Sequence, residues 1–211
     1  MNDKTSVNNQ SPIKSDIQRR DTLRINNYQY VQILKDDKFY CLFSIQGDTI
    51  VKPANYYHEA SFLDIDEDGY KDIRVFVVGN TPNECDNYLF DKELRTFKLI
   101  EHCDLDIQKI KSTPFYYSYN RAGCGDLNWE SYLSKIDNYK LVNYGYLYGQ
   151  GCDFETKATP QVIEIYKVSD SNNGEKKLVE RLSYLKHISK QDDKWVFIET
   201  YWKNNFKKFD R

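Results

Sequence analysis

The sequence predicts a mostly β protein in which short strands, joined by short turns, form an antiparallel meander. Aromatic residues make up 15% of the chain, with 18 Tyr and 11 Phe against a single Met, and such side chains pack well on pleated surfaces. Many short segments alternate between apolar and polar residues. Helical periodicity is weak, and its best candidate, residues 105–110, is too short for a stable helix. Propeller-like blades, a sandwich and an open barrel are all compatible with this pattern.

The expected strands follow one another closely. Residues 28–34 and 39–45 flank the charged turn Lys35-Asp36-Asp37-Lys38 and indicate a hairpin. A short strand at 49–51 precedes residues 56–62, which lead into an acidic loop. Residues 73–78 are β-branched and almost continuously apolar, which predicts a central strand covered on both faces. The remaining expected strands are residues 87–91, 96–100, 114–120, 130–136, 140–148, 161–168, 177–185 and 195–202.

The chain is expected to comprise a flexible N-terminal arm or tether, residues 1–20, and a single β-rich domain, residues 21–211. The opening MNDKTSVNNQSPIKSD is polar and unpatterned, and it lacks the apolar core of a signal peptide. Arms of this kind follow the lipidated cysteine of bacterial lipoproteins. We therefore expect a signal sequence upstream of Met1, and membrane attachment only through an N-terminal lipid anchor absent from this chain.

The charge balance argues against a nucleic-acid partner. Thirty Lys and Arg residues face 32 Asp and Glu residues, for a net charge of −2, so no strong field attracts nucleic acid or acidic membranes. No stretch approaches the roughly 20 apolar residues that span a bilayer.

The five cysteines favour disulfides over metal binding, because none forms the CxxC pair of zinc and redox sites. Cys85 with Cys103 would join the ends of a hairpin, and Cys124 with Cys152 would tie the glycine-flanked loops GCGD and GQGCD. Cys41, within an apolar run, is expected to be a buried thiol. A cytosolic protein with five buried thiols is the alternative.

The acidic loop between two expected strands predicts a calcium site. Asp64, Asp66, Asp68 and Asp72 form a DxDxDGxxD pattern around Gly69. Ca²⁺ takes six to eight oxygen ligands in flexible geometry, and we expect these four carboxylates and the main-chain carbonyl of Tyr70 to supply five. An EF-hand would need a Glu at the twelfth position, where Val75 stands, and flanking helices. The alternative is a solvated acidic turn, but four like charges in nine residues repel each other without a counter-ion.

Catalytic patterns are weak. His58, His102 and His187 lack the spacing of a zinc site, and no GxSxG, GxGxxG or GxxxxGKS motif is present. Asp153 and Glu155 form the best pair of carboxylates for glycoside hydrolysis, yet nothing fixes their separation. The sequence therefore predicts a protein that is not an enzyme.

Two tyrosine clusters, residues 115–121 and 144–151, suggest a binding face. Alternating Tyr residues on a strand place one set in the core and the other outside, where Tyr offers contact area at low entropic cost. Ordinary cross-strand aromatic pairs would give the same pattern.

The loop from Phe62 to Ile73, followed by Asn87-Tyr88-Leu89-Phe90-Asp91 and Phe97, resembles a family of bacterial exported lipoproteins with a calcium loop like that of FG-GAP and VCBS repeats. The segments 123–125, 129–132 and 140–142 also resemble this family, whose relatives include periplasmic immunity proteins that inhibit secreted peptidoglycan hydrolases. The resemblance covers residues 60–142 and implies a compact antiparallel β domain with a protruding loop that blocks the cleft of a lysozyme-like enzyme. It implies a location in the periplasm or at the outer membrane.

Three functions follow as expectations. The first is a non-enzymatic, calcium-binding extracytoplasmic protein that inhibits a peptidoglycan glycoside hydrolase. The second is an envelope carbohydrate-active enzyme or glycan-binding protein that uses its Tyr and Trp faces with Asp153 or Glu155. The third is an adhesion or structural module stiffened by calcium.

Overall fold

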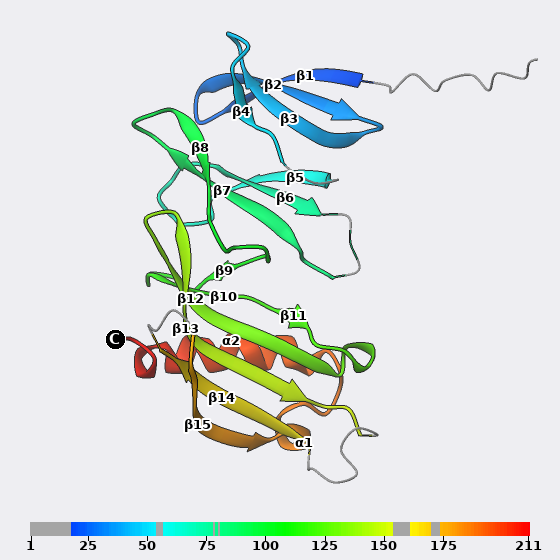
Figure 1. Cartoon of the computed structure of the whole chain (residues 1–211), viewed down its shortest axis with the longest axis vertical. Coiled ribbons are helices and arrows are strands. Elements are labelled where there is room, and N and C mark those ends of the chain that lie inside the picture. The colour runs from blue at the N-terminus through cyan, green and yellow to red at the C-terminus, as the bar shows by residue number, and fades with distance from the viewer. Residues whose placement is uncertain (1–17, 54–56, 78, 80, 154–160, 170–173) are drawn as a thin grey trace, which may run out of the picture.

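The chain folds into three antiparallel sheets that follow one another along its length (Figure 1). The computed structural model describes residues 18–53, 57–77, 79, 81–153, 161–169 and 174–211. Every pairing between its strands is antiparallel. The expected mostly β, antiparallel architecture is confirmed, and none of the sheets closes into a barrel within the described residues.

The first sheet is a four-stranded meander of β1 (Gln18–Ile25), β2 (Tyr28–Lys35), β3 (Lys38–Ser44) and β4 (Thr49–Val51). The expected arm through residue 20 is wrong at its end, because residues 18–20 already pair with β2. The strand was missed because its exposed side chains are largely charged, which hides the alternation. Residues 1–17 lie outside the described part of the chain.

The second sheet repeats this arrangement with β5 (Tyr57–Leu63), β6 (Asp72–Val77), β7 (Cys85–Asp91) and β8 (Thr96–Leu99). A shared apolar core joins the first two sheets. It includes Leu42 and Val51 from the first sheet and Ile73, Val75 and Phe90 from the second. As expected for a central strand, β6 has Ile73 and Val75 completely buried. The two sheets are thus consecutive four-stranded meanders that share one core.

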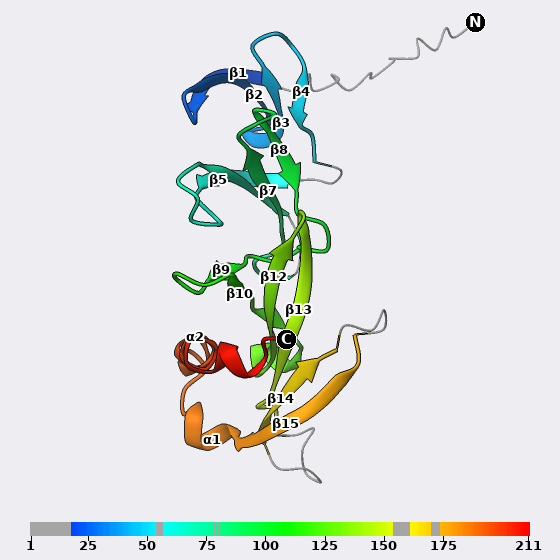
Figure 2. The same cartoon turned by 90° about the vertical axis from the view of Figure 1, so that its left-hand side faces the viewer.

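The third sheet is the largest. Its strands are β9 (Gln108–Lys109), β10 (Phe115–Tyr117), β11 (Asn120–Arg121), β12 (Asn128–Asp137), β13 (Lys140–Gln150), β14 (Val162–Val168) and β15 (Lys176–Ser183). A further apolar core, around Ile65, Ile100 and Ile107, connects the third sheet to the second sheet. The hairpin of β12 and β13 is long and rises towards the second sheet (Figure 2).

Helices follow the last strand and cover one face of the third sheet (Figure 1). They are α1 (Tyr184–His187), α2 (Asp193–Asn205) and the single turn η2 (Phe206–Lys208); an earlier turn, η1 (Cys124–Asp126), precedes β12. No helix among the described residues is long and apolar enough to cross a membrane.

The strand expected at residues 195–202 is wrong, because this segment belongs to α2. Its β-branched and aromatic residues favour a strand locally. Tertiary packing decides otherwise: Lys194, Ile198 and Trp202, spaced by four, are buried against the sheet. Trp202 Nε1 donates a hydrogen bond to Ser131 Oγ of β12 at 2.8 Å. A side chain on Gly145 of β13 would collide with the Trp202 ring, so the helix needs a glycine there.

Candidate functional site

The acidic loop lies where the sequence predicts it, between β5 and β6 at one end of the second sheet. Its turn requires two residues with positive φ, Glu67 at 59° and Gly69 at 91°. The Gly69 position is the sharp turn that the pattern implies, because glycine adopts this conformation without steric cost.

Three of the expected ligands come together. The carboxylates of Asp64, Asp66 and Asp72 each offer an oxygen atom, and these atoms lie within 4.8 Å of one another. The Asp68 carboxylate is not part of this group; its Oδ1 accepts the N–H of Tyr70 at 2.9 Å. The Tyr70 ring packs on Phe90 at a centroid distance of 5.5 Å.

Asp72 is the buried member of the group, with a relative exposure of 1%. Its Oδ2 accepts the N–H of Ile65 at 2.7 Å, and its Oδ1 accepts the N–H of Phe90 at 2.8 Å. Burial raises the pKa of this carboxyl to about 7 against the effect of those two hydrogen bonds, and the charges of Asp66 and Asp68 raise it further. Burial and the neighbouring Asp68 also raise the pKa of Asp66.

Backbone N–H groups inside the loop hold the first carboxylate in place. Asp64 Oδ1 accepts the N–H of Asp68 at 3.1 Å, and Asp64 Oδ2 accepts the N–H of Gly69 at 3.0 Å. Asp66 Oδ1 accepts the same Asp68 N–H at 3.2 Å. The loop is thus folded around its own acidic side chains, with carboxylate oxygens converging on one point.

Residues from the other two sheets also hold the loop, and no local sequence pattern marks them. Asn26, in the turn between β1 and β2, exchanges two hydrogen bonds with the backbone of Lys71. Lys109 Nζ of β9 donates to the main-chain carbonyl of Asp66 and to Tyr116 Oη. Asn26 precedes Lys71 by 45 positions, and Lys109 follows Asp66 by 43. Only the folded structure brings these residues together.

The donor set suits a hard divalent cation. All converging side-chain donors are carboxylate oxygens, and no His or Cys takes part, as Ca²⁺ prefers. Each oxygen that accepts one N–H still has a free lone pair. A bound cation would convert the repulsion among three carboxylates into attraction. Asp64, Asp66 and Asp72 would hold it, while Asp68 and Tyr70 stay predictions as ligands.

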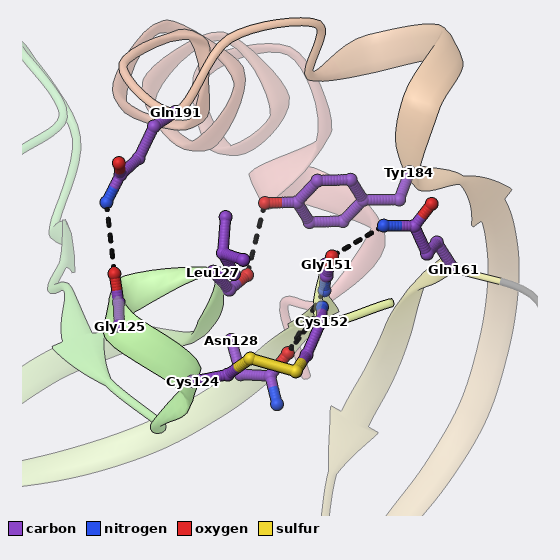
Figure 3. The surroundings of a disulfide bond; sticks show 9 residues. All are labelled: Cys124, Gly125, Leu127, Asn128, Gly151, Cys152, Gln161, Tyr184 and Gln191. Carbon is purple, nitrogen blue, oxygen red and sulfur yellow. Dashed lines mark hydrogen bonds between the residues drawn. A yellow bond between two sulfur atoms is a disulfide. The ribbon is translucent and has the colours of Figure 1, made fainter. Parts of the chain in front are cut away.

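A second feature lies at the far end of the third sheet, where a disulfide joins Cys124 to Cys152 (Figure 3). This pairing was expected and is confirmed. The expected pairing of Cys85 with Cys103 is wrong, because both are buried free thiols, as is Cys41, which was expected to be one. Cys85 and Cys103 are neighbours: the amide Nδ2 of Asn87 lies 3.5 Å from one sulfur and 3.2 Å from the other.

The turn next to the disulfide has an unusual backbone. Gly123, Cys124, Gly125 and Asp126 all have positive φ, at 105°, 53°, 60° and 76°. Two of these are not glycine, and such residues persist in the left-handed region only where their surroundings enforce it.

Several contacts enforce this conformation. Asn128 Oδ1 accepts the N–H groups of Gly151 and Cys152, both at 3.1 Å, on the other side of the disulfide (Figure 3). Lys194 of α2, only 1% exposed, donates to the Asp126 carboxylate at 2.5 Å and to its main-chain carbonyl at 3.1 Å. Tyr119 donates to the same carboxylate. The turn from Gly123 to Asp126, hereafter the stapled turn, is therefore rigid.

The face of the third sheet opposite α2 carries a ladder of tyrosines. Tyr132, Tyr146 and Tyr166 are direct cross-strand neighbours on β12, β13 and β14, with ring centroids 4.9 and 5.8 Å apart. Tyr146 Oη donates to Glu130 at 3.0 Å, and Tyr166 Oη donates to Glu164 at 2.5 Å. Tyr146 belongs to one of the two expected clusters, but it is buried between its neighbours, with a relative exposure of 7%. The ladder is therefore the set of cross-strand aromatic pairs that the sequence offered as the alternative to a binding face.

The remaining candidates for chemistry stay apart. Asp153 is exposed beside the disulfide, and Glu155 lies outside the described residues. His102 and His187 are both exposed, in different parts of the chain, and the side chain of His58 also lies outside the described part.

Comparisons with known proteins give little further guidance. No family model and no curated protein matches the chain. A solved structure described as a Xanthomonas type IV secretion system related protein overlaps with it at a TM-score of 0.46 and 18% identity, over 78% of this chain and 85% of that one. This overlap is too weak to assign a family or a function.

Proposed function

We propose that the chain is a non-enzymatic, extracytoplasmic binding protein whose loop from Asp64 to Asp72 holds one calcium ion. The observation that carries the proposal is the convergence of three carboxylates, from Asp64, Asp66 and Asp72, within 4.8 Å on a loop already closed by its own hydrogen bonds. When bound, the ion supplies charge neutralisation at the point where the loop meets all three sheets. The chain's own residues position the ligands; none of them acts on a substrate.

The disulfide supports a location outside the cytoplasm. Structural disulfides form and persist in oxidising compartments and are rare in the cytosol. The bond between Cys124 and Cys152 closes a segment with a sequence separation of 28, and it anchors the stapled turn. This agrees with the resemblance to periplasmic or outer-membrane-anchored lipoproteins.

The partner we propose is a peptidoglycan hydrolase, with the stapled turn as the contact element. Gly123 and Gly125 are exposed, and a side chain added at either would meet nothing within 4 Å. A narrow, rigid backbone edge of this kind enters a cleft with little loss of conformational entropy, because it is already ordered before binding.

The calcium site is tested by melting the protein with EDTA and with added CaCl₂. Binding to the native state stabilises it by mass action, so the melting temperature should rise with calcium in the wild type and stay constant in the double variant Asp66→Ala/Asp68→Ala. The charge-matched control Glu175→Ala/Asp192→Ala removes two exposed acids that precede β15 and α2, away from the loop, and should keep the rise. A wild type that does not respond to calcium would remove the site.

The partner is tested with insoluble peptidoglycan and a lysozyme-type hydrolase. Inhibition of clearing by the protein, lost in Gly123→Trp/Gly125→Trp, supports the proposal. Clearing by the protein alone would establish the alternative, an envelope carbohydrate-active enzyme. Sedimentation with peptidoglycan without inhibition would indicate a glycan-binding protein, for which the tyrosine ladder beside Glu130 and Glu164 is the favourable observation.

A further inference from the structure

One of the three tryptophans is exposed, and it lies beside the stapled turn. Trp129 and Trp202 are completely buried, whereas Trp195 of α2 is 41% exposed. Its ring packs on that of Tyr119, with a distance of 4.1 Å between the ring centroids. Tyr119 also donates a hydrogen bond to the Asp126 carboxylate of the stapled turn. The exposed indole is therefore held by one of the contacts that make this turn rigid.

Arg121 carries an uncompensated charge next to the same turn. Its Nε atom lies 3.6 Å from Asp126 Oδ1, but the Asp126 carboxylate already accepts a hydrogen bond from Lys194 Nζ at 2.5 Å. Two cations thus share a carboxylate that balances the charge of only one of them. Lys194 is buried, whereas the side chain of Arg121 is 47% exposed. The excess positive charge therefore faces the solvent at Arg121.

The other acids in this region leave the charge of Arg121 in place. Asp193 already accepts two backbone N–H groups, at 3.1 and 2.9 Å. Asp192 is exposed just before α2, and Glu84 and Asp104 line a cavity next to Arg121. None of these four acids forms an ion pair with Arg121 within the described part of the chain.

Helix α2 fixes these groups relative to the stapled turn. The Nζ atom of Lys194 reaches Asp126 from the first turn of the helix and lies 5.2 Å from the ring centroid of Trp195. Gln191, just before the helix, donates to the carbonyl of Gly125 at 3.3 Å (Figure 3). The disulfide holds the other side of the turn. The turn, the indole and the guanidinium therefore form one surface that is ordered before any partner binds.

The chemistry of this surface fits a cleft that contains carboxylates. Tryptophan and arginine are enriched among the residues that dominate binding energy in protein interfaces. A guanidinium pairs with a carboxylate through two parallel hydrogen bonds. Clefts that hydrolyse glycosidic bonds carry a pair of carboxylates, so the free charge of Arg121 is complementary to such a cleft.

We infer that Arg121 and Trp195 are the main binding residues of the stapled turn: Arg121 pairs with a carboxylate in the cleft of the hydrolase, and Trp195 packs on the wall of that cleft. The inference rests on the proposed inhibitor function, to which it adds the residues that determine affinity. It does not depend on the calcium loop.

The free charge is tested first without a partner, by quenching of tryptophan fluorescence. Because Trp195 is the exposed tryptophan, Trp195→Phe should lose most of the quenching by acrylamide. A local positive charge attracts the quencher iodide and repels the quencher caesium. At an ionic strength of about 0.1 M, Arg121→Gln should lower the ratio of the iodide to the caesium quenching constant about twofold or more. The control Lys38→Gln removes an exposed charge in the first sheet and should keep the ratio. An unchanged ratio in Arg121→Gln would overturn the inference.

Binding is then measured by isothermal titration calorimetry with a lysozyme-type hydrolase and with its variant in which both catalytic carboxylates are amides. We expect Arg121→Gln and Trp195→Ala each to weaken binding to the active hydrolase about tenfold or more. Against the amide variant, Arg121→Gln should cost much less, because the carboxylate that pairs with Arg121 is gone. Lys38→Gln should bind as the wild type does. An unchanged melting temperature shows that a loss of binding is not a loss of fold.

The outcomes separate the inference from the function on which it rests. A hydrolase that binds the wild type and both variants equally would overturn the inference and leave the proposed inhibitor in place. The same loss in Arg121→Gln against both forms of the hydrolase would show that Arg121 does not meet the carboxylates of the cleft. Sedimentation with peptidoglycan that requires Trp195 would show that the indole stacks on glycans instead. A wild type that does not bind the hydrolase at all would overturn the proposed function together with the inference.

Discussion

Asn26 and Lys71 are 45 positions apart, yet they are joined by two hydrogen bonds. Asn26 Nδ2 donates to the carbonyl of Lys71 at 2.8 Å, and the N–H of Lys71 donates to Asn26 Oδ1 at 2.7 Å. The turn of the first hairpin therefore holds the acidic loop just before Asp72, the last of its proposed ligands. Asn26 also adopts a φ of 51°, a conformation that asparagine tolerates better than most residues.

Replacing Asn26 by glycine should weaken calcium binding. Asn26→Gly keeps the positive φ of the turn but removes both bonds to Lys71, so the loop must be ordered by the ion itself. Because one hydrogen bond contributes ~1 kcal/mol, we expect the calcium affinity to fall by up to about tenfold, measured by isothermal titration calorimetry. Asn27→Gly is the matched control: Asn27 has a φ of 67° and is exposed. Equal losses in both variants would contradict the bracing role.

Asp72→Ala should destabilise the protein even without calcium. The substitution leaves the buried N–H groups of Ile65 and Phe90 without their acceptor. Each such group costs ~1–3 kcal/mol, so we expect the free energy of unfolding in EDTA to fall by roughly 2–4 kcal/mol, as determined by urea denaturation. Asp68→Ala removes an acceptor in the exposed part of the same loop and should cost less. A result in which Asp68→Ala is the more damaging would show that Asp72 has no such structural role.

Asp126 should make the stability of the protein sensitive to acid. Burial raises its pKa, but hydrogen bonds from Lys194 and Tyr119 outweigh that effect and lower the pKa below its ordinary value. The stabilisation is therefore complete above about pH 4, the pKa in the unfolded chain, and is lost as the pH falls through the lower folded value. Urea melts from pH 6 to pH 2.5 should show a steeper acid loss in the wild type than in Asp126→Asn. Parallel curves would refute this assignment.

The cysteines should react in a distinctive order. Burial raises the pKa of both Cys85 and Cys103 to about 12, and thiols react as thiolates. At pH 8 the native protein should take up no iodoacetamide, whereas the urea-unfolded protein should take up three without reductant and five after reduction, as read by intact mass. A single adduct in urea without reductant would mean that Cys85 and Cys103 are joined as a second disulfide.

Gly149→Ala should be among the most damaging small substitutions. A methyl group at this position in β13 would lie 2.1 Å from Cε2 of Trp129, which is completely buried. Overpacking of a well-packed core costs ~1–3 kcal/mol and occasionally more. Thermal unfolding should show a large drop in melting temperature. A variant with unchanged stability would show that the Trp129 ring can move aside freely.

The sequence predicted features that depend on local patterns. The hairpin turn at Asp36 and Asp37, the buried strand around Ile73 and Val75, and the acidic loop with Gly69 all follow from residues close together in the chain. The confirmed disulfide was also predictable from the sequence, because both cysteines lie in glycine-rich loops.

Features decided by distant partners were missed. Residues 195–202 favour a strand locally, and only the packing of Ile198 and Trp202 against the third sheet makes them helical. Cys85 and Cys103 are neighbours, as their place at the ends of a hairpin suggests, yet Asn87 lies between them as a shared donor. Lys109 and Asn26 reach the acidic loop from different sheets, and nothing in their local sequence marks them.

Each of the three sheets is built from strands that are consecutive in the chain: β1 to β4, β5 to β8 and β9 to β15. Pairing between near neighbours has a low loop-closure cost and forms early. A chain that emerges from a translocation channel with its N-terminus first could thus complete one sheet before the next has appeared. The hydrogen bond between Lys109 and the acidic loop would then form late, because Asp66 must wait for β9. Assembly would run from the N-terminal meander towards the third sheet, where the disulfide closes last.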